Sequence, residues 1–396
     1  MTIPSRFEFE CPVKVHFGER ALEHLPFELR ALDAAKPLVI CDGQASREGC
    51  LASVIKAFRN AAMTLGVVED VAGEDPQTIV PQLAAIYRDK DCDAIVAVGQ
   101  GGFIDAAKWL NLAVSTGEEE LEAFVEGRAL PPLTQPLAVI PPAAADGFET
   151  SGYLRGNAAT LRSVHLMPRL LFLDKRTVGA PDDAIMAETA LVALTHGLES
   201  FFQGGGNPMT AIYARTAVRL AASVLHQLAH RGKRDSHLAL TVAHAAALSG
   251  CALGAAPPAL THRLGTAVAQ NGKATAAQAM GVILSYALEH RAVDGRLDAA
   301  LLLELLGGRD RYARTPAGQR GPAAFYFLRN LLNLLFEGTG GRVKRTLLDL
   351  GMTAEEVRQA AERAGADGDR DALAQASAIL THAWEGRPFL ATDGHR

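Results

Sequence analysis

The 396-residue chain has little cysteine, few aromatic residues and little net charge. Its five cysteines are scattered, and no two form a Cys-x-x-Cys pair, which argues against a disulfide framework or a cysteine-based zinc site. No apolar run approaches the roughly 20 residues of a membrane-spanning helix, and no secretory leader precedes the first predicted strand. A formal net charge of −5 disfavours nucleic acid and anionic membranes as partners. We therefore expect a cytoplasmic protein with reduced thiols.

Short apolar runs in the first half of the chain alternate with segments of helical periodicity. The predicted strands are 13–17, 37–41, 67–73, 94–98, 136–140 and 170–174. The predicted helices are 21–29, 51–66, 78–89 and one that begins near Phe103. Strands that alternate with helices indicate a parallel sheet covered on both faces. We predict a Rossmann-like α/β dinucleotide-binding domain over residues 1–178.

The second half has a different character, because alanine and leucine dominate and strand signals disappear. The predicted helices are 184–203, 210–231, 238–253, 260–268, 275–290, 298–306, 322–337, 353–364 and 370–384. The charged segment 310–314 is expected to be a solvent-facing loop. We predict an all-α domain over residues 179–396.

A glycine-rich turn, Gly99–Gly102, directly follows the buried strand predicted at 94–98 and precedes a helix. Glycines let the backbone approach a phosphate, and the free N–H groups and dipole of a helix amino terminus favour negative charge. The spacing matches neither the dinucleotide fingerprint nor the P-loop, so an ordinary βα turn is the alternative. Two further candidate ligand loops, 42–44 and 141–149, also follow predicted strands.

Six segments, in the same order along the chain, resemble motifs of the iron-containing alcohol dehydrogenase family. They are Val15–Gly18, Gly99–Lys108, Ile140–Glu149, Leu191–Glu199, Thr261–Gly265 and Ala383–Pro388. The last of these resembles a common ending in the maleylacetate reductase branch of that family.

This resemblance implies a dehydroquinate synthase-like fold, a homodimer, and hydride exchange between a nicotinamide cofactor and an alcohol–carbonyl pair. The cofactor-binding positions that it implies are Asp42, Gly99, Gln100, Gly101, Gly102, Asp105 and Lys108, with Pro142, Ala143 and Gly147 in the third loop. A carboxylate at Asp42, after a strand, accepts bonds from an adenosine ribose and repels a 2′-phosphate, which favours NAD over NADP.

The sequence departs from the family at the metal site and in the third loop. The resemblance retains one ligand as His196, but it places Val192, Pro258 and Asn271 at the other ligand positions. Valine and proline offer no side-chain donor, so we predict that no metal is bound. An unexpected ligand pair such as His196 with His244 is the alternative.

In the third loop, the family's paired threonines and its serine correspond to Pro142, Ala143 and Phe148. Hydroxyl groups that would bond the cofactor are therefore missing. Either the cofactor binds through backbone groups, or its binding is weakened or lost.

Without a metal, the protein itself must supply a proton donor and stabilise the developing oxyanion. The resemblance places His262 near the nicotinamide, so His262 is the first candidate for proton transfer and His196 is the second. Two structural helical histidines are the alternative.

A carboxylate on the substrate is expected to bind at Arg263, Lys273 and Asn271, although plain surface cations are the simpler interpretation. We predict a metal-independent NAD(H)-dependent oxidoreductase that acts on an alcohol–carbonyl pair of a small-molecule or peptide-terminal substrate. The competing hypothesis is a non-catalytic relative that serves as a binding scaffold.

Overall fold

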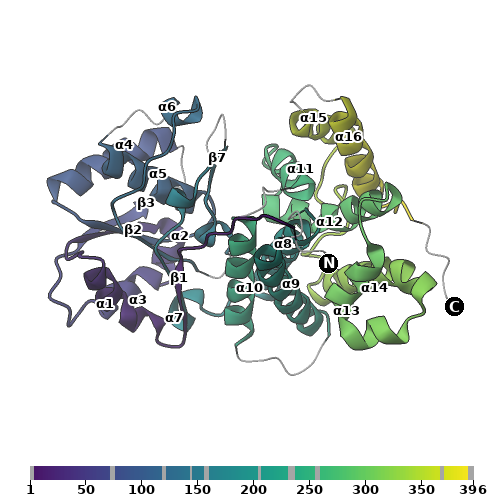
Figure 1. Ribbon diagram of the computed structural model, residues 1–396, viewed down its shortest axis with the longest axis horizontal. Coiled ribbons are helices and arrows are strands. Elements are labelled where there is room, and N and C mark those ends of the chain that lie inside the picture. The colour runs from purple at the N-terminus through teal and green to yellow at the C-terminus, as the bar shows by residue number, and fades with distance from the viewer. Residues whose placement is uncertain are drawn as a thin grey trace. The chain divides into compact units, whose positions relative to one another are not determined.

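A computed structural model describes residues 4–71, 76–117, 122–142, 145–155, 160–203, 207–230, 237–254, 259–365 and 370–390 (Figure 1). The chain divides into two compact units. The sheet unit comprises Glu8–Pro181 and Ser236–Ala255, and the helical unit comprises Met1–Phe7, Asp182–Asp235 and Ala256–Arg396. None of the described helices combines the length and apolar character that a membrane span requires.

The sheet unit is built on six parallel strands in the order β1-β8-β5-β4-β2-β3. Their bounds are β1 (Lys14–Gly18), β2 (Pro37–Asp42), β3 (Gly66–Val71), β4 (Ala94–Val98), β5 (Leu137–Ile140) and β8 (Leu170–Asp174). These are the six strands predicted from the sequence, so the predicted α/β architecture is confirmed. A small antiparallel hairpin, β6 (Tyr153–Arg155) with β7 (Thr160–Arg162), was not predicted.

Helices cover both faces of this sheet (Figure 1). The helices that pack against it are η1 (Ala21–His24), α1 (Leu25–Ala31), α2 (Gly43–Arg47), α3 (Cys50–Ala57), α4 (Pro76–Asp89), α5 (Gly102–Thr116), α7 (Lys175–Val178) and α10 (Leu238–Leu253). The unit also contains α6 (Glu122–Val125), η2 (Phe148–Thr150) and η3 (Val164–Leu166). Because side chains alternate along a strand, β2 contributes side chains to two hydrophobic cores, one on each face of the sheet. Leu38 and Ile40 pack with residues of α4 and α5, whereas Val39 and Cys41 pack with residues of α1 and α3.

The helical unit holds the remaining helices. They are α8 (Asp183–Gln203), α9 (Pro208–Ala229), α11 (Leu260–Ala269), α12 (Ala276–Val293), α13 (Ala299–Arg314), η4 (Ala317–Gln319), α14 (Arg320–Gly338), α15 (Ala354–Ala364) and α16 (Arg370–Glu385). The prediction of a loop at 310–314 was wrong, because α13 continues through it after a kink at Gly308, where φ is +82°.

The strand order identifies one edge of the sheet as a ligand-binding edge. From β2 the chain moves outward to β3, and from β4 it moves the opposite way to β5 and β8. The reversal lies between β2 and β4, where Cys41 pairs with Val98. In open parallel sheets, ligands bind beyond the carboxyl ends of the strands at this switch point. Asp42 follows Cys41 and Gly99 follows Val98, so these two residues are neighbours at the expected binding position.

Candidate functional site

The glycine turn after β4 presents unpaired backbone donors. Gly101 has φ +59° and precedes the first residue of α5, Gly102. Among the residues that the structure describes, the N–H groups of Gly101 and Gly102 have no hydrogen-bond partner. Neither has a side chain to block an approaching ligand. Open N–H groups at the amino terminus of a 15-residue helix suit an anion such as a pyrophosphate.

Asp42 joins the two neighbouring loops of the switch point. Its Oδ1 accepts the Ala45 N–H at 2.6 Å and caps α2, while Oδ2 accepts the Gln100 N–H at 3.3 Å. A Cβ atom at Gly99 would collide with Asp42 Oδ2 and the Phe103 ring, so this approach requires glycine. Asp42, Gln100 and Gly102 also line one cavity of about 380 Å³, together with Gln44, Arg47 and Asp70. The structure thus brings these predicted cofactor-binding residues together.

Lys108, which was also predicted to bind the cofactor, makes its hydrogen bonds within the protein. Its side chain is wholly buried, and Nζ donates to the carbonyl oxygens of Phe148, Ser151 and Tyr153 at 2.7–2.8 Å. Burial lowers the pKa of Lys108 to about 8, and the negative charge of Asp105 opposes that shift. An ammonium group has three donors, and all three are used here. Lys108 therefore holds the 148–153 segment and has no proton left for a phosphate.

Asp105 is likewise committed to the protein. It is 3% exposed; its Oδ1 accepts the Arg155 N–H at 3.0 Å, and its Oδ2 accepts the Arg155 side-chain Nε–H at 2.7 Å. The same guanidinium bonds Asp146 at 3.2 Å and lies 3.9 Å from the centre of the Phe148 ring. Asp105 thus ties α5 to β6, and Arg155 extends this link to the third loop.

The third loop packs inward. Pro142 is buried, and Ala143 lies outside the described residues. Gly147 has φ +90°, and a Cβ there would meet the Ala246 carbonyl of α10 at 3.1 Å. Phe148, which replaces the family's serine, is 1% exposed and packs with Tyr153 and Leu253. The Phe148 ring therefore fills the core of the sheet unit instead of projecting from the loop.

Glu149 is a buried carboxyl group with one oxygen unsatisfied. Its Oε2 accepts the Gly147 N–H at 2.8 Å, whereas Oε1 has no hydrogen-bond partner among the described residues. Burial, and then the negative charge of Asp146, raise the pKa of Glu149 to about 8. The folded sheet unit thus favours the protonated form.

We expect Glu149→Gln to remove a pH dependence of stability. Because the folded pKa of about 8 lies above the ordinary value of 4.5, the native state holds the proton more tightly, and stability falls as pH rises between these values. The variant should be more stable than the parent at pH 8 by about 2 kcal/mol, with less difference at pH 5. The chain has two tryptophans, so urea unfolding followed by Trp109 emission in a Trp384→Phe background reports on the sheet unit. An equal difference in stability between variant and parent at pH 5 and pH 8 would contradict the raised pKa of Glu149.

The two histidines predicted as separate candidates for proton transfer are in direct contact in the helical unit. His196 Nε2 of α8 and His262 Nδ1 of α11 lie 3.0 Å apart, a hydrogen bond in which one ring must donate and the other accept. His196 is wholly buried and His262 is 8% exposed. Of the two residues, only His262 therefore has any exposed surface, and the bond fixes the orientation of each ring relative to the other.

Glu199, one turn after His196 on α8, fixes the start of α11. Its Oε1 accepts the Thr261 N–H at 2.6 Å, although the carboxyl group is only 3% exposed. Burial raises the pKa of Glu199, and hydrogen bonds from Thr261 and the His262 backbone oppose that shift. Glu199 was not among the predicted site residues, but its i, i+3 spacing from His196 places both on one face of α8. This contact positions the His262 backbone.

The residues predicted to hold a substrate carboxylate are not gathered together. Arg263 is exposed and follows His262 on α11. Lys273 is paired with Glu356 at 2.8 Å and also donates to the Gly351 carbonyl. Asn271 donates to Met352 Sδ and accepts the Lys273 N–H at 2.9 Å. Lys273 and Asn271 thus stabilise the turn after α11. Of the two predicted cations, Arg263 is the one whose side chain is not held by another residue in the described part of the chain.

The residues present do not fit the divalent metal that the family name implies. At the expected ligand positions, Val192 is a buried apolar side chain, Asn271 is bound to Met352, and Pro258 lies outside the described residues. His196 directs Nε2 at His262. In the described parts of the chain, no three His, Cys, Asp or Glu side chains are close enough to share an ion. One histidine and an amide form a poor donor set.

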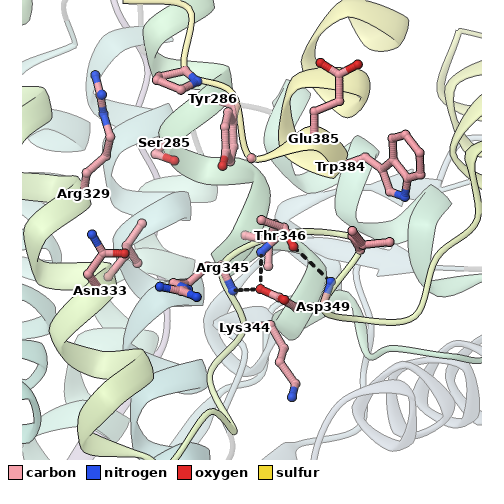
Figure 2. A pocket seen from close by; sticks show the side chains of 16 residues that line it. Ser285, Tyr286, Arg329, Asn333, Lys344, Arg345, Thr346, Asp349, Trp384 and Glu385 are labelled. Atoms are coloured by element: carbon pink, nitrogen blue, oxygen red, sulfur yellow. Dashed lines mark hydrogen bonds between the residues drawn. The ribbon is translucent and has the colours of Figure 1, made fainter. Parts of the chain in front are cut away.

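A second cavity of about 410 Å³ lies in the helical unit (Figure 2). It is lined from α12, α14, the loop before α15 and the end of α16, and neither His196 nor His262 is among its lining residues. The Trp384 indole N–H donates to the Met352 carbonyl at 2.9 Å, which holds the ring in the wall. The segment Ala383–Pro388, which carries the maleylacetate reductase resemblance, therefore shapes this cavity and not the histidine pair.

Known proteins resemble this chain in sequence and in fold. A choline dehydrogenase of Bacillus subtilis is 24% identical over 70% of this chain and 72% of its own length. Maleylacetate reductase 2 of Cupriavidus pinatubonensis is 26% identical over 64% of this chain and 65% of its own length. The crystal structure of maleylacetate reductase from Rhizobium sp. strain MTP-10005 has the same fold, with a TM-score of 0.74, 23% identity, and coverage of 97% of this chain and 100% of that one.

Two family descriptions cover most of the sequence. Residues 12–175 match "iron-containing alcohol dehydrogenase", and residues 186–377 match the C-terminal part of the same family. The resemblance inferred from the motifs is thus confirmed: the chain belongs to the iron-containing alcohol dehydrogenase family of oxidoreductases.

Proposed function

We propose that this protein is a metal-independent, NAD(H)-dependent oxidoreductase that interconverts an alcohol and a carbonyl compound. The observation that carries the proposal is the bond between His196 and His262, in a chain whose expected metal-ligand positions Val192 and Pro258 have no side-chain donor. When bound, NADH supplies the hydride. The chain itself must then provide only a proton and a hydrogen bond to the carbonyl oxygen.

His262 donates the proton in the direction of carbonyl reduction. As the carbonyl oxygen gains negative charge, the second ring nitrogen of His262, Nε2, delivers a proton to it. Hydrogen bonding to His196 Nε2 keeps the ring oriented and lets the pair share the remaining proton. Glu199 maintains this alignment by holding the first turn of α11.

The cofactor is proposed to bind at the glycine turn Gly99–Gly102, which is called the cradle from here on. The open N–H groups of Gly101 and Gly102 suit its pyrophosphate, and Asp42 at the end of β2 suits the adenosine ribose. Backbone donors compensate in this way for the hydroxyl groups missing from the third loop.

The proposed substrate carries a carboxylate, which Arg263 beside His262 would bind. Such a substrate resembles the one named for the maleylacetate reductase relatives, and a peptide terminus presents the same group. We also propose a cytoplasmic homodimer, which light scattering of the purified protein tests.

The first experiment is calorimetric titration of chelator-treated protein with NADH and then with NADPH. We expect micromolar binding of NADH without metal, followed by NADH oxidation in a screen of 2-oxo and 3-oxo acids. Stoichiometric metal in protein purified without chelators would overturn metal independence. No binding of either nucleotide would favour the alternative, a non-catalytic scaffold.

Asp42→Ser should shift cofactor preference toward NADPH. Serine still caps α2, but it removes the charge that repels a 2′-phosphate. We expect the ratio of NADPH to NADH affinity to rise by about tenfold or more, which corresponds to roughly 1.4 kcal/mol. The matched control is Asp93→Ser, which removes an equal charge from the start of β4, where Asp93 accepts the Ala35 and Lys36 N–H groups. An unchanged ratio in Asp42→Ser would contradict the ribose assignment.

A further inference from the structure

Two cysteines separated by 240 positions in the sequence lie side by side in the sheet unit. Cys11 Sγ, in the segment before β1, is 3.4 Å from Cys251 Sγ, in the last turn of α10. Cys11 is partly exposed, whereas Cys251 is 5% exposed. The disulfide bond length is about 2.0 Å, so the two sulfur atoms need to approach by only about 1.4 Å.

From this juxtaposition we propose that Cys11 and Cys251 form a reversible redox site that a hydroperoxide converts to a disulfide. The proposal does not depend on the oxidoreductase activity. It assigns a modification site to two residues that neither the cradle nor the histidine pair uses.

The environment gives the two thiols different roles. A hydrogen bond from Cys251 lowers the pKa of Cys11 to about 7, whereas the same bond and burial raise the pKa of Cys251. Cys11 is therefore the thiolate and the accessible nucleophile, and Cys251 is the resolving thiol. The other three thiols lack this combination of exposure and lowered pKa. Cys41 and Cys50 are buried, and burial raises the pKa of Cys92.

The reaction balances with hydrogen peroxide as the oxidant. The Cys11 thiolate attacks one peroxide oxygen, the O–O bond breaks, and the leaving hydroxide takes a proton to become water. Cys251 sulfur then attacks the sulfenic sulfur of Cys11, the S–O bond breaks, and the thiol proton leaves with the second water. Two thiols lose two electrons, and one peroxide gains them.

The crosslink would fasten the amino-terminal segment to the helix that supports the third loop. Thr150 Oγ1 donates to the Ala247 carbonyl of α10 at 2.7 Å, and Gly147 packs against the same helix. A bond that closes a loop of this length restricts the unfolded chain strongly. Oxidation is therefore expected to raise the melting temperature of the sheet unit by several degrees, roughly 5 °C.

The test treats the full-length protein with hydrogen peroxide and maps cysteines by mass spectrometry of non-reduced peptides. We expect a Cys11–Cys251 linked peptide and the rise in melting temperature, both reversed by dithiothreitol. Cys92→Ser should behave as the parent does, while Cys11→Ser and Cys251→Ala should lose both effects. The parent protein alone decides the question if a variant fails to fold. A stable Cys11 sulfinic acid without a crosslink, or a crosslink between two chains, would overturn the proposal.

Discussion

Replacing His262 with alanine should lower kcat for carbonyl reduction by about 10²- to 10⁴-fold, the usual contribution of a positioned general acid. The affinity for NADH should change little, because the proposed cradle lies at Gly99–Gly102 on another part of the chain. Free imidazole should restore part of the rate, since it can occupy the vacated space and deliver the same proton. A role in packing alone would predict a less stable protein and no rescue.

The matched control for this experiment is His230→Ala. His230 is an exposed histidine of the same unit, at the end of α9. His196→Ala provides an intermediate case, because His196 is wholly buried and is proposed to act through its bond to His262. We expect its kcat to fall less than that of His262→Ala. A fall of less than tenfold in His262→Ala, with structure intact, would remove His262 from the proton route.

Local sequence signals predicted the framework well. Buried apolar runs such as Ala94–Val98 mark β2, β4, β5 and β8. The alanine-rich helices of the second half begin and end near the predicted residues, except that α13 continues to Arg314 instead of ending at 306. The hairpin of β6 and β7 was missed because strands of three residues are too short to show alternation. That α10 belongs with the sheet was also not foreseen, since periodicity reports a helix but not the core it packs against.

Long-range contacts explain why the site was predicted only in part. His196 and His262 were chosen separately from motifs 66 positions apart, and only the crossing of α8 with α11 shows that they bond. The same holds for Cys11 and Cys251, which no local pattern connects. The proximity of Asp42 to the glycine turn was easier to predict, because the carboxyl ends of neighbouring parallel strands lie at the same edge of the sheet.

Lys108 makes contacts that its motif did not predict. It follows Gly102 by six positions, which is about 9 Å along the axis of α5. Only the first turn of a helix offers open N–H groups to an anion, so a residue this far along need not face the ligand. In the structure Lys108 instead bonds three carbonyl oxygens of the segment that follows the third loop.

Lys108→Met should therefore destabilise the sheet unit by about 3 kcal/mol, because methionine keeps most of the volume but leaves three buried carbonyl groups without their donor. Urea unfolding followed by Trp109 emission in the Trp384→Phe background measures this change. Lys175→Met is the matched control in the same unit, since Lys175 forms only an exposed pair with Glu19 and should cost less than about 1 kcal/mol.

The same variant separates a structural lysine from a cofactor ligand. If Lys108 only organises the 148–153 segment, Lys108→Met that remains folded should bind NADH within about threefold of the parent, a change well under 1 kcal/mol. A lysine that bound the pyrophosphate would give the opposite result, namely a large loss of NADH affinity with nearly unchanged stability. Because Nζ already has three acceptors within 2.8 Å, a phosphate could bind it only by displacing a carbonyl, and the unfolding measurement would then show that those bonds contribute little.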